Sequence, residues 1–230
     1  MHFLPANRLR LYRNFKAIEA NDFYGTIRFY ERFENALRAL DFGEYLECTV
    51  LYANALFETE QYGKHVVMCD HLLEIVIENN VHSWGGDDIF LKILYDKSVS
   101  LFYLRDFDKS AHVLRELIKM NPRHNGYLRL LNKNLLYQRP RWMRTTRAIF
   151  ILLVLLSALT IMLQLFLIKP FMSDLEEKTQ WLYYTLLGLG IGILLFAESL
   201  HAFGCARKST GFRNGVLKRN HLEGTNLKDV

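Results

Sequence analysis

The chain has 230 residues, half of them hydrophobic, and a formal net charge of +5. This length leaves room for one soluble domain of ordinary size in addition to a membrane segment. Residues 1–138 hold 17 Lys and Arg against 18 Asp and Glu, whereas residues 139–230 hold 12 against 6. A duplex-binding protein would carry its basic patch on the folded domain, so this distribution argues against nucleic acid and favours anionic lipid headgroups.

The cysteines argue against a disulfide framework or a zinc site, and the N-terminus argues against a signal peptide. Cys48, Cys69 and Cys205 are odd in number and have no CxxC spacing, so neither a disulfide framework nor a zinc knuckle is indicated. Three free cysteines fit a reducing compartment. The first fifteen residues contain too short an apolar stretch for the hydrophobic region of a signal peptide. We therefore expect the first membrane segment to begin near Ile149.

Three short polar turns, each closed by an aromatic residue, divide the N-terminal region. They are "NDF" at 21–23, "EQY" at 60–62 and "RDF" at 105–107, and each lies between two amphipathic helical stretches. Aligning the aromatic residues gives two equivalent positions with mostly small or polar side chains and a third with apolar ones: Thr26, His65 and Ser110; Asn14, Ala53 and Ser98; and Phe33, Leu72 and Leu117. Small residues allow two helices to approach closely, so the pattern predicts three helical hairpins.

The third hairpin, about residues 91–124, resembles the tetratricopeptide repeat family. The small, apolar, turn, aromatic and proline positions of that repeat match Ser98, Leu101, Asp106, Phe107, Ser110, Leu114, Leu117 and Pro122. The first and second hairpins, about residues 7–40 and 46–79, fit more loosely, because they lack the proline and extra residues separate them. Arg13 and Lys97 also stand where leucine is usual. The resemblance covers about half the chain and implies an all-α repeat domain over residues 1–138, closed by a last amphipathic helix at His124–Gln138.

In this family the first helix of each hairpin lines a concave groove. The resemblance assigns the following residues to that groove: Arg8, Leu11, Phe15 and Ile18; Val50, Asn54 and Phe57; Lys92, Tyr95, Val99, Phe102 and Tyr103. An apolar and aromatic groove with polar rims suits an extended peptide or an amphipathic helix. Two alternatives remain open: several of these residues pack the stack of helices, or the chain's own tail fills the groove.

Two apolar runs predict a transmembrane hairpin over residues 139–206. The 21 residues between Arg147 and Lys169 carry no charge, which is enough to cross a hydrocarbon core of roughly 30 Å as a helix. A second run begins at Trp181 with several aromatic residues, as is typical of a membrane interface. We expect spans at about 148–168 and 181–203. Pro140 should end the preceding helix.

Basic residues lie outside the two spans rather than between them. The N-terminal flank holds Arg129, Lys133, Arg139, Arg141, Arg144 and Arg147, and the C-terminal flank holds Arg207, Lys208, Arg213, Lys218 and Arg219. The short linker between the spans contains only two lysines. The positive-inside rule therefore predicts an integral membrane protein with two spans, a cytoplasmic helical domain, a basic cytoplasmic tail over 207–230 and the linker outside.

The second span contains polar and small residues that need an explanation. An ionisable residue at membrane depth, such as Glu198 or His201, is a hypothesis for an ion or proton path through an oligomer. Glu198 lies late in the span, near the cytoplasmic interface at about 1.5 Å per residue, so an ion pair at the headgroup boundary is the favoured alternative. Gly188 and Gly192 form a face that permits close approach, either to the first span or to another protomer.

The sequence shows features of a protein-binding module and no motif of a known enzyme class. Residues 1–138 contain no P-loop, nucleophile elbow or HExxH motif, so we expect neither an enzyme nor a cofactor. His65 and Cys69 share a helix face, but it is the predicted buried face, and we expect no metal site. The sequence predicts a membrane-anchored adaptor that binds a protein or peptide partner at the cytoplasmic membrane face. The alternative is an oligomeric membrane effector, or an ion- or proton-conducting component, gated by the helical domain.

Overall fold

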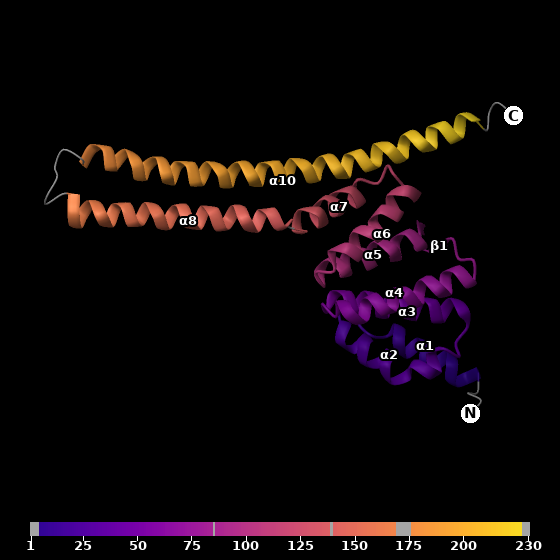
Figure 1. The fold of residues 1–230 in the computed structure, drawn as a ribbon. Helices are drawn as coiled ribbons and strands as arrows, with labels where there is room; N and C mark the ends of the chain where they lie inside the picture. The colour runs from indigo at the N-terminus through magenta and orange to yellow at the C-terminus, as the bar shows by residue number, and fades with distance from the viewer. Residues whose placement is uncertain (1–4, 85, 139, 169–175, 227–230) are drawn as a thin grey trace. The chain divides into compact units, whose positions relative to one another are not determined.

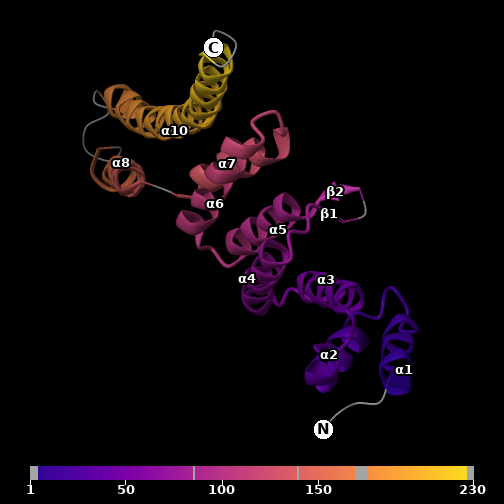
Figure 2. The same ribbon diagram turned by 90° about the vertical axis from the view of Figure 1, so that its right-hand side faces the viewer.

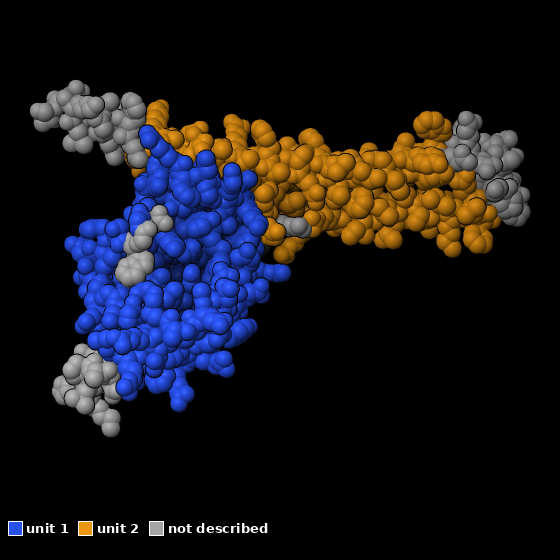
Figure 3. Space-filling model, turned by 180° about the vertical axis from the view of Figure 1, so that it is seen from behind, with its two compact units in different colours: residues 1–134 blue, residues 135–230 orange. Residues whose placement is uncertain are grey.

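The structure is a computed structural model that describes residues 5–84, 86–138, 140–168 and 176–226 (Figure 1). The chain divides into an N-terminal unit, Met1–Asn134, and a C-terminal unit, Leu135–Val230, which are coloured separately in Figure 3. The predicted all-α fold is confirmed for the described residues. The exception is a two-residue antiparallel pairing of β1 (Ser83–Trp84) with β2 (Asp87–Asp88).

Three helical hairpins form most of the N-terminal unit (Figures 1 and 2). They are α1 (Pro5–Lys16) with α2 (Phe23–Leu37), α3 (Phe42–Glu58) with α4 (Tyr62–Glu78), and α5 (Ile89–Tyr103) with α6 (Phe107–Met120). The next helix is α7 (Asn125–Tyr137). Each helix from α1 to α5 packs against the one that follows it, and α1 also contacts α3. Consecutive packing of this kind buries the apolar face of one hairpin against the next.

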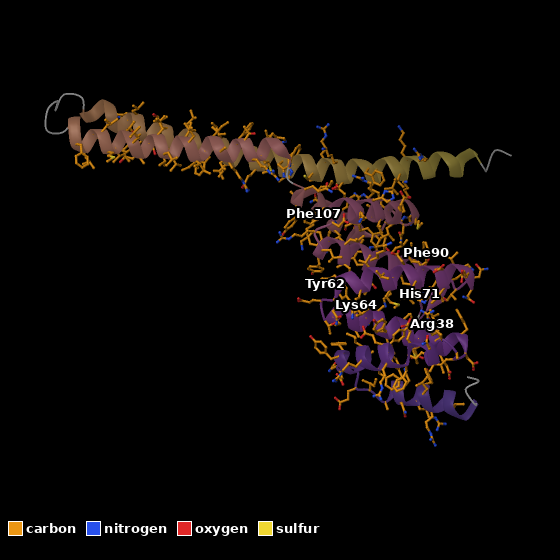
Figure 4. The ribbon with its side chains drawn as sticks, turned by 60° about the horizontal axis from the view of Figure 1, so that its bottom comes forward. Arg38, Tyr62, Lys64, His71, Phe90 and Phe107 are labelled. Carbon is orange, nitrogen blue, oxygen red and sulfur yellow. The ribbon has the colours of Figure 1, made fainter. Side chains whose placement is uncertain are left out.

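The three aromatic residues of the sequence alignment occupy the same structural position. Phe23, Tyr62 and Phe107 are the first residues of α2, α4 and α6. The side chains of Asp22 and Asp106 accept a hydrogen bond from the backbone N–H three residues later, which caps the helices that follow them. Figure 4 shows Tyr62 and Phe107 on the same side of the stack of helices. The alignment therefore identified equivalent turns.

The turns of the second and third hairpins have the same backbone geometry. Glu60 and Arg105 have φ values of 59° and 62°, in the left-handed region. The N–H of the next residue donates to the carbonyl oxygen of Leu56 at 2.9 Å in one turn and of Leu101 at 3.0 Å in the other. This arrangement satisfies carbonyl groups at the end of the first helix and reverses the chain into the second.

The predicted close approach of helices is observed in the third hairpin. Ser98 and Ser110 are fully buried, and the Ser110 hydroxyl donates to the Ser98 carbonyl oxygen at 2.7 Å. The apolar positions Leu72 and Leu117 are buried as well. In the first hairpin, by contrast, the equivalent Asn14 is exposed. The first hairpin therefore departs from the pattern that the third follows.

Helix α3 contributes to two core clusters among the described residues of the N-terminal unit. Tyr52 and Leu56 pack with residues of α1 and α2, and the rings of Tyr52 and Tyr30 stack with centroids 4.1 Å apart. Leu46 and Ala53, also on α3, pack with residues of α4 and α5. Because one helix contributes to both clusters, it joins the first hairpin to the third.

The C-terminal unit contains two long helices. They are α8 (Arg141–Leu163), which continues into a π-helical segment η1 (Gln164–Ile168), and α10 (Glu176–Asn226), which packs along α8. Pro140 has extended backbone geometry and immediately precedes α8, while α7 ends at Tyr137. Pro140 thus separates the two helices, as predicted.

Both long helices have the length and composition of membrane spans. The apolar segments are Trp142–Phe166 and Trp181–Arg219, and only 6% and 11% of their most apolar windows are buried within the structure. Core helices of soluble proteins would be mostly buried. Most of this apolar surface is therefore uncovered by the chain itself.

The second long helix continues beyond the expected membrane span. The sequence predicts a span at about 181–203 followed by a basic tail, and α10 runs without interruption to Asn226. Arginine, lysine and leucine are good helix formers and offset the cost of glycines such as Gly211. The linker at 169–175 and the chain end at 227–230 lie outside the described residues.

Candidate functional site

Two cavities lie on the surface around α3 in the N-terminal unit. The first, about 210 Å³, lies between α1, α2 and α3 and is lined by residues that include Phe15, Ile18, Leu51 and Asn54. The second, about 40 Å³, lies between α3, α4 and α5. Asn54 lines both cavities, so they are neighbours on one strip of surface.

The second cavity combines apolar walls with a few polar groups. The apolar walls come from Val50, Ala53, Leu72, Ile89 and Ile93, and the polar lining comes from Asn54, His65, Cys69, Lys92 and Asp96. Asn54 and Lys92 are exposed, whereas His65 and Cys69 are buried. Binding sites for small groups commonly pair apolar walls with a few polar atoms that fix orientation.

Asp96 lines this cavity with a carboxylate that no described group of the chain pairs. Its carboxylate makes no hydrogen bond or ion pair with any residue in the part of the chain that the structure describes. Burial raises its pKa to about 6, and the positive charge of Lys92, one helical turn earlier, only partly opposes this rise. Partial burial disfavours the charged form of a carboxylate that no protein group pairs, and a carboxylate of this kind in a cavity is a candidate binding group.

His65 and Cys69 form a neutral pair beside this carboxylate. His65 Nδ1 lies 2.8 Å from Ser100 Oγ, and His65 Nε2 lies 3.5 Å from Cys69 Sγ. Burial lowers the pKa of His65 to about 4 and raises the pKa of the Cys69 thiol. Neither group is charged near neutral pH, and a buried neutral thiol is a poor nucleophile. Among the described residues, no group of three or more His, Cys, Asp or Glu could hold a metal ion.

The structure brings part of the predicted groove together. Phe15, Ile18 and Asn54 line the first cavity, and Val50, Asn54 and Lys92 line the second. Leu11, by contrast, packs against the core cluster of the first hairpin. Val99 is half-buried and lines neither cavity. Nothing is described of the side chain of Arg8.

Aromatic residues of α5 that were assigned to the groove contact α7 instead. The ring of Tyr95 lies 5.4 Å from that of Tyr127, and the ammonium of Lys133 lies 4.9 Å from the ring centroid of Phe102. Phe102 is only 8% exposed. These contacts favour the alternative in which Tyr95 and Phe102 pack between helices of the stack, because α7 of the same chain covers them.

The other two aromatic residues of the predicted groove pack near the turns. Tyr103 stacks on Tyr62 with ring centroids 4.7 Å apart, and Phe57 meets the edge of the same Tyr62 ring at 5.7 Å. These rings join the second hairpin to the third. Of the residues assigned to the groove, those that line the two cavities lie around Asn54.

Polar residues of α10 lie opposite the start of α8 in the C-terminal unit. Arg147 Nη2 donates to Glu198 Oε1 at 3.2 Å. The rings of Trp142 and His201 meet edge to face with centroids 6.2 Å apart. Glu198 thus has a cationic partner within the same pair of helices, at the end of the first uncharged run.

The glycine that permits close packing of α8 and α10 is Gly190. A Cβ atom added there would lie 3.4 Å from the ring of Phe150 and 3.5 Å from Cβ of Leu153. Added Cβ atoms at Gly188 and Gly192 would meet no atom of the described chain within 4 Å. The face formed by Gly188 and Gly192 therefore does not pack against the first span.

Sequence reasoning missed Asp96. An acidic residue four positions after Lys92 on an amphipathic helix is usually part of a solvated charge pair. The signal that would have found it is the spacing of Ile89, Ile93 and Asp96, which places the acid on the apolar face of α5.

Comparisons of the chain with models of protein families, with characterised proteins and with solved structures find no match. Evidence for function therefore comes from the residues of the chain themselves.

Replacing Asp96 with Asn should raise the free energy of unfolding at pH 7.5 by about 1–3 kcal/mol, because the amide removes a carboxylate whose charged form burial disfavours. A carboxyl group with a raised folded pKa contributes stability that is complete below its unfolded value, near 3.8, and is lost as the pH rises through about 6. The advantage of the variant should therefore shrink between pH 7.5 and pH 4. Urea unfolding of the full chain in detergent at both pH values measures this difference in the free energy of unfolding between the variant and the parent.

The matched control is Glu78→Gln, which makes the same charge change at an exposed position of α4. We expect it to show no such dependence on pH. An Asp96→Asn variant that is less stable than the parent at pH 7.5, or whose advantage is the same at both pH values, would contradict this account of Asp96.

Proposed function

We propose that the chain is a membrane-anchored helical-repeat adaptor whose cytoplasmic domain binds a protein or peptide partner in the groove around Asn54. The observation that carries the proposal is the pair of adjoining cavities on α3, in a chain whose other unit exposes two long apolar helices. Adjacent cavities on one strip of surface suit successive side chains of an extended segment. No enzymatic chemistry is part of the proposal.

Tetratricopeptide-like geometry of the N-terminal unit is part of this proposal. It is supported by the common position of Phe23, Tyr62 and Phe107 at helix starts and by the buried contact of Ser110 with Ser98. In such a stack the first helices of successive hairpins share one face, and α3 and α5 both line the second cavity.

Insertion of α8 and α10 into a bilayer is supported by the apolar side chains that the chain leaves uncovered. Leu155, Phe196 and Phe203 are 65%, 66% and 69% exposed, and they belong to a larger set along both helices. Burial of apolar surface contributes roughly 25 cal/mol per Å², so a continuous surface of this kind favours a hydrocarbon environment. A bilayer provides one.

The orientation is supported by the basic residues outside the spans and by the length of α10. That helix has 51 residues, or about 75 Å at 1.5 Å per residue, which exceeds twice the roughly 30 Å of a hydrocarbon core. Its basic end must therefore leave the bilayer. Under the positive-inside rule both ends of the transmembrane hairpin lie in the cytoplasm and the linker lies outside.

The alternative of an oligomeric, conducting component is less well supported. Its strongest sequence feature was Glu198, and this carboxylate is paired with Arg147 at the edge of the apolar run. The free face of Gly188 and Gly192 leaves room for association between protomers, but association alone provides no conduction path. The adaptor accounts for the same residues without such a path.

A photo-crosslinking residue in place of Asn54 tests the adaptor directly. In cells that express the protein at native level, we expect a discrete adduct with a second polypeptide, because Asn54 lies at the boundary of both cavities. The same residue in place of Val67, which is 68% exposed and lines neither cavity, should form no such adduct. Equal patterns at the two positions, or no adduct at Asn54, would count against the proposal.

Glu198→Gln separates the adaptor from the conducting alternative. An exposed ion pair contributes roughly 0–1 kcal/mol, so loss of the Arg147 contact should leave membrane levels, partner crosslinking and cellular function nearly unchanged. Immunoblotting of membranes measures the membrane level, and the crosslink from position 54 measures partner binding. Loss of cellular function or of ion flux, with normal membrane levels and normal crosslinking, would instead favour the conducting alternative.

A further inference from the structure

The second cavity holds a negative charge that the chain does not neutralise. Asp96 lines it together with the apolar walls of Val50, Ile89 and Ile93. In the described parts of the chain no side chain or backbone group forms an ion pair or hydrogen bond with its carboxylate. A carboxylate in an apolar recess is stabilised most by a cation that enters the same recess.

We propose that this cavity selects a basic side chain of the bound peptide, lysine or arginine, whose cation pairs with the Asp96 carboxylate. The inference rests on the proposed function, because it specifies the chemistry of the partner that occupies the groove. It also accounts for a charge that weakens the free protein.

The walls of the cavity match the remainder of such a side chain. Lysine and arginine have apolar stems below their charged groups, and these stems pack against aliphatic surface while the cation reaches a polar partner. Val50, Ile89 and Ile93 provide that surface. A narrow stem suits a space of about 40 Å³, whereas the neighbouring cavity is larger, about 210 Å³, and Lys16 and Glu19 line it together with Phe15 and Leu51.

The other polar groups of the cavity do not repel a cation from its interior. Burial holds His65 neutral near neutral pH, and its nitrogen Nδ1 already contacts Ser100. Lys92 is the one cationic side chain among the described lining residues. It is exposed and lies more than 4 Å from Asp96 oxygens, so it competes only weakly with an entering cation.

Asn54 supplies a contact for the backbone of the same peptide. Its exposed side-chain amide lies between the two cavities and makes no hydrogen bond within the described chain. An extended peptide has unpaired backbone N–H and C=O groups, and one amide side chain can bind both. The ligand is therefore an extended segment that carries a basic residue for the second cavity.

The test uses the full chain in nanodiscs of phosphatidylcholine, which carry no net charge and so do not attract basic peptides. The probes are pools of acetylated and amidated heptapeptides in which one position at a time holds lysine, arginine, norleucine, glutamine or glutamate. We expect one position at which lysine or arginine binds at least about tenfold more tightly than norleucine. That preference should disappear in Asp96→Asn.

Two control variants show whether the preference comes from this cavity. Glu78→Gln, with the same loss of charge on an exposed part of α4, should keep the preference, and Lys92→Gln should strengthen it by removing the competing cation. Binding without a basic preference, a preference for acidic peptides, or a basic preference that survives Asp96→Asn would overturn the inference and leave the adaptor intact. Failure of every pool to bind any variant would contradict both proposals.

Discussion

The uncovered apolar surface of α8 and α10 is the constraint on which the rest of the proposal depends. Two helices that bury so little of their most apolar windows expose apolar surface that a hydrocarbon environment would stabilise. Within a bilayer, only the inner seam of the pair has to be filled by protein, and Gly190 lets the helices approach there. The charged contacts then fall at the ends of the spans, where Arg147 meets Glu198. In the proposed adaptor, a helical domain held at a membrane in this way would meet its partner at the membrane surface.

The helical stack concentrates its binding features on α3. This helix contributes to both core clusters and also carries Asn54, which lines both cavities. A side chain on such a helix is held by packing on either side, and in the proposed adaptor a preorganised groove would lose less entropy on binding. The carboxylate of Asp96 in this region forms no hydrogen bond or ion pair with the described residues. Its raised pKa is a cost to the free protein that a cationic partner would remove.

Local patterns predicted the architecture well because short-range chemistry determines it. Phe23, Tyr62 and Phe107 marked the starts of equivalent helices, and Pro140 marked the boundary before α8. The residues of the groove were assigned by helix position alone, and the structure places them in different surroundings. Periodicity cannot show that α7 covers Tyr95 and Phe102, since that contact depends on how a later helix packs. For the same reason Asp96 went unnoticed: its sequence neighbours include Lys92, and only the packing of α3, α4 and α5 leaves its carboxylate without a partner.

The most direct test of the central claim is cysteine labelling of intact cells with a membrane-impermeant maleimide. The native Cys48, Cys69 and Cys205 are buried, so cysteines added at Ser173 in the linker and at the exposed Asn214 of α10 can be followed selectively. The account predicts that the Ser173→Cys chain is labelled in intact cells and that the Asn214→Cys chain is labelled only after permeabilisation. Labelling of Asn214→Cys but not Ser173→Cys in intact cells would place the helical domain on the opposite side of the membrane and contradict the account.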